Sequence, residues 1–272
     1  MRTTSNPAFR NLPTGQGGYA TFDRQGGGMM GGGAAYADSQ AARAGFGRAG
    51  AGERPLTVDD VVVKTAITGA VALVAGILTA WSGLFGLALP AIIVGFVVSL
   101  IVIFKQSTNP FLVLLYSASM GVALGALTGA LEFSGTNFQG IGFQAIVGTA
   151  GVFVGMLIVY KTGAVRVTPR FTKWLIGASI GVVLLMLANM VMSFFTIGGL
   201  GLRDGSPLAY LFSIVCIGVA AFSLMLDFDM ADRAVKEGAP AKFSWYIAFG
   251  LMTTLVWLYI EILRLLSYLR QD

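Results

Sequence analysis

Long uncharged apolar blocks alternate with short charged connections along most of the chain. The first block, residues 65–104, contains no Asp, Glu, Lys or Arg. Five later blocks share this property: 106–131, 133–160, 174–202, 205–226 and 243–260. A helix needs about 20 apolar residues to cross the hydrocarbon core of a bilayer. The first block is therefore long enough for two spans, separated near residues 82–86, and each later block provides one.

This pattern predicts an all-α membrane protein, a bundle of seven transmembrane helices. The last span is long enough only if it includes Glu261 and reaches about Leu269. The expected spans are 61–81, 87–104, 110–131, 141–160, 174–197, 207–230 and 243–269. The composition agrees, because 56% of the 272 residues are hydrophobic and only 11% are charged, whereas roughly a quarter of the residues of a soluble domain are charged.

The absence of histidine restricts the chemistry that is open to the chain. Without histidine in the sequence, histidine-based acid–base catalysis, Ser-His-Asp triads and the usual zinc sites are excluded. The single cysteine, Cys216, can form no intrachain disulfide. We therefore expect neither an enzyme nor a resident cofactor. The net charge of +5 is attributed to basic cytoplasmic loops and not to nucleic-acid binding.

Residues 1–54 differ in composition from the rest of the chain. They contain the glycine runs 26–28 and 31–33, scattered arginines and few branched aliphatic residues. Such a segment buries too little apolar surface to offset the entropy of ordering. We expect a disordered Gly/Ala-rich cytoplasmic tail followed by a transmembrane domain over residues 55–272. The alternative function for the tail is a partner-binding arm.

The distribution of Lys and Arg predicts the orientation in the membrane. Basic residues concentrate in cytoplasmic connections. Of the 18 basic residues, 15 lie in the amino-terminal segment or in the second, fourth and sixth connections, and the first and third connections have none. We therefore expect the amino terminus inside the cell and the carboxyl terminus outside, with the protein in the cell membrane.

Glycines spaced four residues apart mark three of the expected helices. This spacing places them on one helix face, where a neighbouring backbone can approach closely. The sets are Gly121, Gly125 and Gly129 in the third helix, Gly151 and Gly155 in the fourth, and Gly177 and Gly181 in the fifth. We interpret all three sets as packing surfaces and not as ligand sites.

Two groups of acidic residues are candidates for function. Glu261 lies inside the seventh span, where an ionised group costs about 3 kcal/mol at the bilayer centre and needs a partner. Its alternative interpretation is a simple i,i+3 ion pair with Arg264. Asp227 and Asp229 close the sixth span. Since residues two apart in a helix point about 200° apart, at most one of them faces the bundle centre, and a solvated helix end is the alternative.

A contact between Asp227 and Glu261 would place two carboxylates in one low-dielectric site. Such a pair titrates as a unit and could act as a pH switch or as a cation site. A hairpin that turns at residues 238–240 would, however, pair Asp227 with about residue 252. This register leaves Glu261 about 13 Å deeper at 1.5 Å per residue, so the contact requires a tilted or broken helix.

The segments Leu226-Asp227-Phe228-Asp229 and 257–266 (WLYIEILRLL) resemble the signature of the Bax inhibitor-1 (transmembrane Bax inhibitor motif) family. Pro90 and the glycine-spaced third helix also fit, and the resemblance covers about residues 60–269, most like a bacterial branch. It implies a bundle whose seventh helix is central and wrapped by six others. It also implies a pH-sensitive calcium leak channel gated by a hydrogen-bonded acid pair, which corresponds by motif to Asp227 and Glu261.

Two positions depart from the family pattern. The seventh-helix acid is Glu261, where the best-described pattern has Asp. The basic cluster that closes the second helix and latches onto the sixth-helix acid is reduced here to Lys105.

These observations together predict a cation leak channel, with Ca²⁺ as the expected ion. Asp227 and Glu261 are the candidate gate, pH sensor and calcium ligands, since Ca²⁺ favours carboxylate oxygens. Asp229 is a candidate ligand on the ion path, and Lys105 and Arg264 are candidate latch or path residues. Lipid and a cation are the expected partners. The alternative is a non-conducting protein that binds other membrane proteins, such as a protease or stress machinery.

Overall fold

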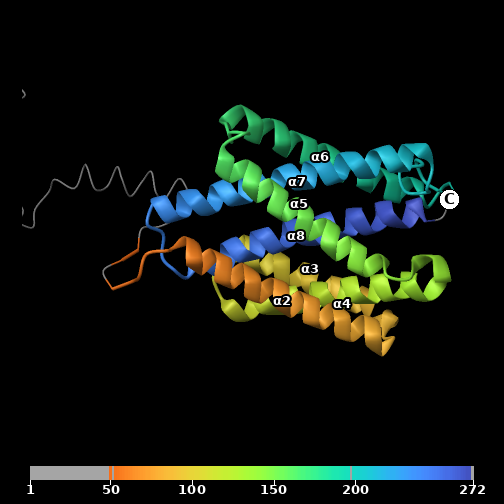
Figure 1. The fold of residues 1–272 in the computed structure, drawn as a ribbon, viewed down its shortest axis with the longest axis horizontal. Helices are drawn as coiled ribbons and strands as arrows, with labels where there is room; N and C mark the ends of the chain where they lie inside the picture. Colours follow the sequence, from red (N-terminus) through yellow and green to blue (C-terminus); the bar gives the residue numbers. More distant parts are fainter. Residues whose placement is uncertain (1–48, 51, 197, 271–272) are drawn as a thin grey trace, which may run out of the picture. The chain divides into compact units, whose positions relative to one another are not determined.

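The computed structural model describes residues 49–50, 52–196 and 198–270. Within this part of the chain, seven helices are long and apolar enough to cross a membrane, which confirms the all-α seven-helix prediction (Figure 1). They are α2 (Val58–Ser82), α3 (Ala88–Lys105), α4 (Pro110–Ser134), α5 (Ile141–Thr162), α6 (Pro169–Met192), α7 (Pro207–Lys236) and α8 (Phe243–Leu269), with single 3₁₀ turns at Phe85–Leu87 and Thr136–Phe138. The tail is expected to be disordered, and its residues 1–48 lie outside the described part of the chain.

Helices α6 and α7 differ most from the sequence prediction, since α6 spans Pro169–Met192 instead of 174–197 and α7 ends later than expected. Helix α6 begins at Pro169, because Thr168 caps its amino terminus by accepting a hydrogen bond from the Phe171 amide at 3.2 Å, and proline is well suited to the first helical position. Helix α7 continues to Lys236, past the acidic cluster where the expected span ended. Its last turns are polar and are supported by i,i+4 ion pairs.

Helix α8 is the central element, as the family resemblance implied. Half of the residues in its most apolar 18-residue segment are buried inside the protein, compared with 17% of the equivalent segments in α2, α5 and α6. It packs chiefly against α2, α4, α5 and α7 (Figure 1). Helices α3 and α6 pack mainly on α4 and α7 respectively, so four of the six other helices, and not all six, provide most of the wall around α8.

The closest helix packing joins α2 and α4 through glycine. A Cβ atom on Gly121 would lie 2.3 Å from the Ala72 carbonyl oxygen, and one on Gly125 would lie 2.1 Å from that of Gly76. The packing interpretation is therefore confirmed for α4. It is wrong for the α5 and α6 sets, because a Cβ on any of those glycines would meet no described atom within 4 Å: Gly151, Gly155, Gly177 and Gly181.

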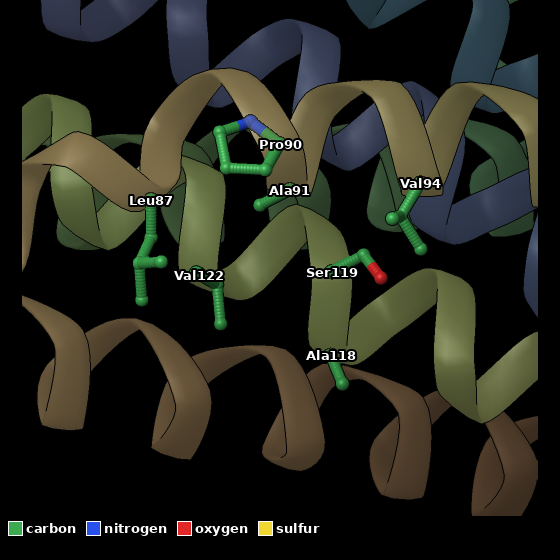
Figure 2. Close-up of a pocket in the computed structure, with 7 residues that line it drawn as sticks. All are labelled: Leu87, Pro90, Ala91, Val94, Ala118, Ser119 and Val122. Carbon is green, nitrogen blue, oxygen red and sulfur yellow. The ribbon is translucent and has the colours of Figure 1, made fainter.

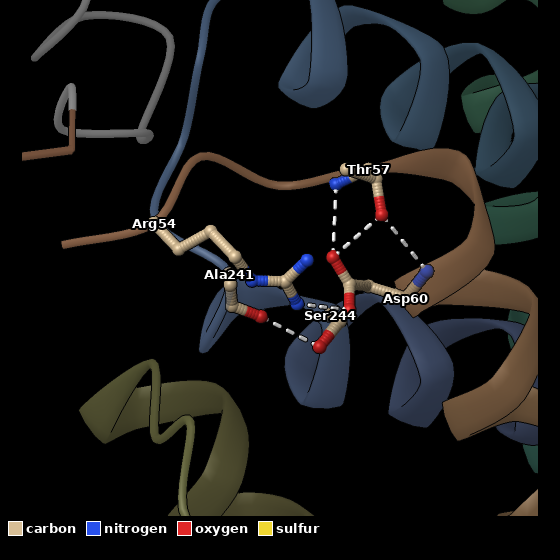
Figure 3. A network of polar contacts seen from close by, with 5 residues as sticks. All are labelled: Arg54, Thr57, Asp60, Ala241 and Ser244. Carbon is tan, nitrogen blue, oxygen red and sulfur yellow. Dashed lines mark hydrogen bonds and ion pairs between the residues drawn. The ribbon is translucent and has the colours of Figure 1, made fainter.

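The segment before α2 is tied to the connection between α7 and α8. The Leu56 amide donates to the Ala239 carbonyl at 2.7 Å, and the Ala241 amide donates to the Arg54 carbonyl at 2.9 Å. Thr57 and Asp60 form a reciprocal capping box at the start of α2, and Arg54 pairs with Asp60 (Figure 3). We refer to residues 52–57 as the strap; it fixes the beginning of α2 against the beginning of α8.

We expect Gly125→Ala to destabilise the bundle, because the added methyl group forces α2 and α4 apart. Overpacking of this kind costs about 1–3 kcal/mol. Gly155→Ala is the matched control, since its new Cβ enters open space. Thermal unfolding in detergent can be followed by reaction of a fluorogenic maleimide with Cys216, which is fully buried. Equal melting temperatures for the two variants would contradict the close α2–α4 contact.

Candidate functional site

Asp227 lies on α7 and contacts the central helix through a hydroxyl group. The Thr254 Oγ1 of α8 donates to the Asp227 Oδ2 at 2.6 Å. The Asp227 side chain is partly buried. The residue opposite Asp227 is therefore Thr254, close to residue 252, which a simple hairpin predicts. The sequence analysis did not identify Thr254 as the partner.

The two other acids within the last turns of α7, Asp229 and Asp232, have basic partners. Asp229 pairs with Arg233 at 2.6 Å and Asp232 pairs with Lys236 at 2.5 Å, each one turn along α7. Tyr160 of α5 also donates to the Asp232 Oδ2 at 3.4 Å. Among the described residues, Asp227 has no ion-pair partner. It is therefore the one carboxylate of this acidic cluster whose charge is balanced only by a neutral hydroxyl.

Glu261 is held by two arginines at the other end of α8. Its side chain is 1% exposed, and the Arg264 Nη1 donates to both carboxylate oxygens at 2.8 Å. Arg203, in the connection between α6 and α7, approaches to 3.5 Å. The i,i+3 ion pair considered from the sequence is therefore present. The second arginine was not expected, because Arg203 lies in a connection and is distant from Glu261 in the sequence.

The two guanidinium groups exceed the single carboxylate by one positive charge. Burial, followed by repulsion from the Arg264 guanidinium, lowers the pKa of Arg203, and attraction by the Glu261 carboxylate opposes this shift. Even so, an arginine remains charged at neutral pH because its ordinary pKa lies far above 7. The cluster of Arg203, Glu261 and Arg264, called here the arginine clamp, is therefore cationic.

Asp227 and Glu261 are not brought together in the described structure. The partner of Asp227 on α8 is Thr254, seven residues before Glu261, which corresponds to about 10 Å along the helix axis. Helix α8 is one continuous helix from Phe243 to Leu269, so the broken helix that a direct contact would need is not present. Asp227 and Glu261 therefore belong to two separate clusters at different levels of α8, and not to one acid pair.

The expected calcium ligands do not form a binding site for a resident metal. Among the described residues, no group of three or more Asp, Glu, Cys or His side chains is placed to hold a metal ion. Ca²⁺ ordinarily takes six to eight oxygen ligands. Lys105 ends α3 and is exposed, and no ion pair joins it to an acid in the described part of the chain.

One shallow cavity between α3 and α4 offers little chemistry. It has a volume of about 300 Å³, and Pro90 and Val94 face Ser119 across it (Figure 2). Ser119 donates its hydroxyl to the Leu115 carbonyl at 2.8 Å. The other side chains that line the cavity are apolar. We therefore place the candidate functional site on α7 and α8 and not in this cavity.

The sequence of the whole chain was compared with known protein families. The family model described as "Bax inhibitor 1 like" matches residues 6–271. The chain belongs to this family. The match includes most of the tail, which the resemblance drawn from motifs had left outside. No curated protein matches the sequence. This Bax inhibitor 1-like protein is therefore a multi-pass membrane protein, in contact with the lipid bilayer through its seven apolar helices.

We expect Arg264→Met to destabilise the protein strongly, because it leaves Glu261 buried without its bidentate partner. Removing one member of a buried ion pair costs about 3–5 kcal/mol. The double variant Glu261→Gln/Arg264→Met should recover part of this loss, since the fully buried carboxylate is then neutral and only Arg203, whose side chain is 31% exposed, loses its partner. The matched control is Arg233→Met, whose exposed pair with Asp229 contributes less than about 1 kcal/mol. Thermal unfolding of the wild type, of the single variants Arg264→Met and Glu261→Gln, and of the double variant measures the coupling; additive effects would contradict the clamp.

Proposed function

We propose that this Bax inhibitor 1-like protein is a pH-sensitive cation leak channel of the cell membrane, with Ca²⁺ as the ion. The observation that carries the proposal is the position of Asp227 and the absence of a basic partner for it among the described residues. It is a carboxylate within a membrane-spanning helix, it faces the central helix, and its partner among the described residues is the hydroxyl of Thr254. Ionisable groups inside spans typically mark ion pathways.

The ionised Asp227 supplies both attraction for a cation and a bond between two helices. Its negative charge, not cancelled by a basic residue, raises the local concentration of cations, as charged clefts generally do. Its short bond to Thr254 holds α7 against α8. Protonation removes the charge and weakens the bond, so one proton changes both ion attraction and helix contact. Asp229, at the same end of α7, is the proposed ligand that a cation meets before it reaches Asp227.

The arginine clamp forms the second level of the proposed gate. Arg203 and Arg264 oppose a cation, and Glu261 reduces this barrier by cancelling one positive charge. Glu261 thus contributes to the gate at a distance from Asp227 and not through direct contact with it. In this proposal the cation is cargo, and the protein is neither an enzyme nor the holder of a cofactor. The amino terminus lies inside the cell and the carboxyl terminus outside, as the distribution of basic residues favours.

Calcium flux into proteoliposomes across pH tests the proposed gate. Wild-type flux should rise with pH, because the carboxylate of Asp227 attracts a cation only when ionised. Asp227→Asn should reduce flux about tenfold or more and flatten the pH profile. Glu261→Gln should also reduce flux, because it leaves the two arginines uncompensated. Asp232→Asn is the matched control, since that carboxylate is already paired with Lys236, and its flux should stay near the wild-type value.

A double variant makes the gate hypothesis easy to refute. If Asp227→Asn/Glu261→Gln is folded and retains both the flux and the pH profile of the wild type, neither acid belongs to the gate.

A second candidate function is a non-conducting protein that binds and modulates other membrane proteins. The strap favours it, because the tail continues directly into residues that pair with the connection between α7 and α8. A partner bound to the tail would thereby be linked to the ends of both helices. Co-purification of the full chain and of a variant without residues 1–48 tests this function. A partner lost with the tail, together with no calcium flux by the full chain, would favour it over the channel.

A further inference from the structure

A second, larger cavity lies among α2, α4, α5 and α8. Its volume is about 720 Å³, within the range of about 300–1,000 Å³ that is typical of small-molecule sites. Most of its lining side chains are apolar, and small residues of α2 and α4 such as Gly76 and Gly125 keep the space open. Along α2 the lining runs from Gly69 to Trp81, about 18 Å at the rise of a helix. The lining is therefore long enough for a hydrocarbon chain.

Three polar side chains converge at one end of this cavity. The hydroxyl groups of Thr128 and Tyr259 share a hydrogen bond of 2.9 Å, and Glu132 accepts a hydrogen bond from the Gly142 amide at 3.0 Å. All three surround Gly142: a Cβ there would lie 2.5 Å from Thr128 Cγ2, 3.3 Å from Glu132 Oε1 and 3.7 Å from Tyr259 Oη. The cavity therefore has an apolar body and one compact polar end.

This polar end has unused capacity for hydrogen bonds. Two hydroxyl groups that share one bond retain one proton to donate, and a carboxylate has about four acceptor positions. Among the described residues, Glu132 forms no ion pair, and its other carboxylate oxygen receives no hydrogen bond. Glu132 lies in the last turn of α4, where a span meets the head-group region of the bilayer. The site can thus offer one donor and several acceptors, with a negative charge.

The opening of the cavity faces the lipid. Ile77 and Trp81 of α2 and Phe143 of α5 line it and are 58%, 86% and 71% exposed. Large apolar side chains exposed on membrane-spanning helices contact hydrocarbon, so a ligand can enter sideways from the bilayer. The polar end is held in place by Arg270, which donates to the carbonyls of Asn137 and Gln139 in the connection between α4 and α5, both at 2.9 Å.

We propose that this cavity binds one molecule of a phospholipid with a primary ammonium head group, of the phosphatidylethanolamine class. One acyl chain occupies the apolar body. The ammonium group donates to Glu132, and a phosphate oxygen accepts the free proton of the Thr128–Tyr259 pair. A choline head group has no N–H to donate, and a glycerol head group leaves the lipid with a net negative charge that Glu132 repels. This site does not depend on whether the protein conducts ions.

Native mass spectrometry of the full-length protein in detergent tests the proposal. Phosphatidylethanolamine, phosphatidylcholine and phosphatidylglycerol with identical acyl chains are added in turn at equal concentration. We expect one tightly retained ethanolamine lipid, with an affinity about five- to tenfold above that of the other two. Glu132→Gln should remove this preference, because the amide oxygen can still accept from Gly142 but the charge is gone. Tyr259→Phe should weaken retention about two- to threefold.

A pair of bulky substitutions separates the cavity from the general lipid surface. Ala150 lines the cavity on α5, so Ala150→Phe should fill it and abolish tight retention. Val147→Phe is the matched control, since Val147 is on the same helix, is 53% exposed and does not line the cavity. Melting temperatures near that of the wild type establish that each variant is folded. Equal retention of the three lipids by the wild type, an unchanged preference in Glu132→Gln, or retention by Ala150→Phe would each overturn the proposal.

Discussion

The hydrocarbon core offers no partner for a polar group, and the arrangement of this protein follows from that constraint. A hydroxyl in a span bonds to its own helix, as Thr149 does to the Ala145 carbonyl and Ser117 to the Val113 carbonyl. A carboxylate needs more than this, because an ionised group is far more costly to bury than a hydroxyl. Glu261 receives two arginines, Asp227 receives Thr254, and Glu132 receives the Gly142 amide. Not every buried hydroxyl has a hydrogen-bond partner, since those of Thr65, Ser213 and Tyr268 have none in the described part of the chain.

Helix α8 connects all three carboxylates because it is central. Thr254 contacts Asp227, Glu261 is part of the helix itself, and Tyr259 lies beside Glu132 at the cavity. The same rigid element therefore carries the two proposed levels of the gate and one wall of the proposed lipid site. A change in how α8 sits against α7 or α4 would affect more than one of these sites. This gives a physical basis for lipid occupancy and ion passage to influence one another.

Much of the fold could be predicted from the sequence, and the errors have specific causes. The seven spans follow from the lengths of uncharged segments, which is a local property. The prediction starts α6 too late, because Arg170 and Lys173 interrupt the uncharged block although Thr168–Pro169 is a helix-start signal. The prediction ends α7 too early, because a run of acids resembles a helix end, whereas i,i+4 bases allow the helix to continue. The glycine spacing is equally regular in three helices, yet of these glycine sets only the one in α4 meets a close neighbour.

The candidate site shows where local information ends. The sequence by itself determined that Asp227 and Glu261 stand out, because charges are rare in an apolar chain and each one inside a span needs an explanation. It also determined the i,i+3 relation of Glu261 and Arg264, since helical periodicity places them on one face. Only the tertiary structure decided that Asp227 faces Thr254, that Arg203 completes the clamp, and that Glu132 and Tyr259 meet at one cavity. Those contacts depend on the register and packing of helices that are distant in the chain, and no spacing along a single helix encodes them.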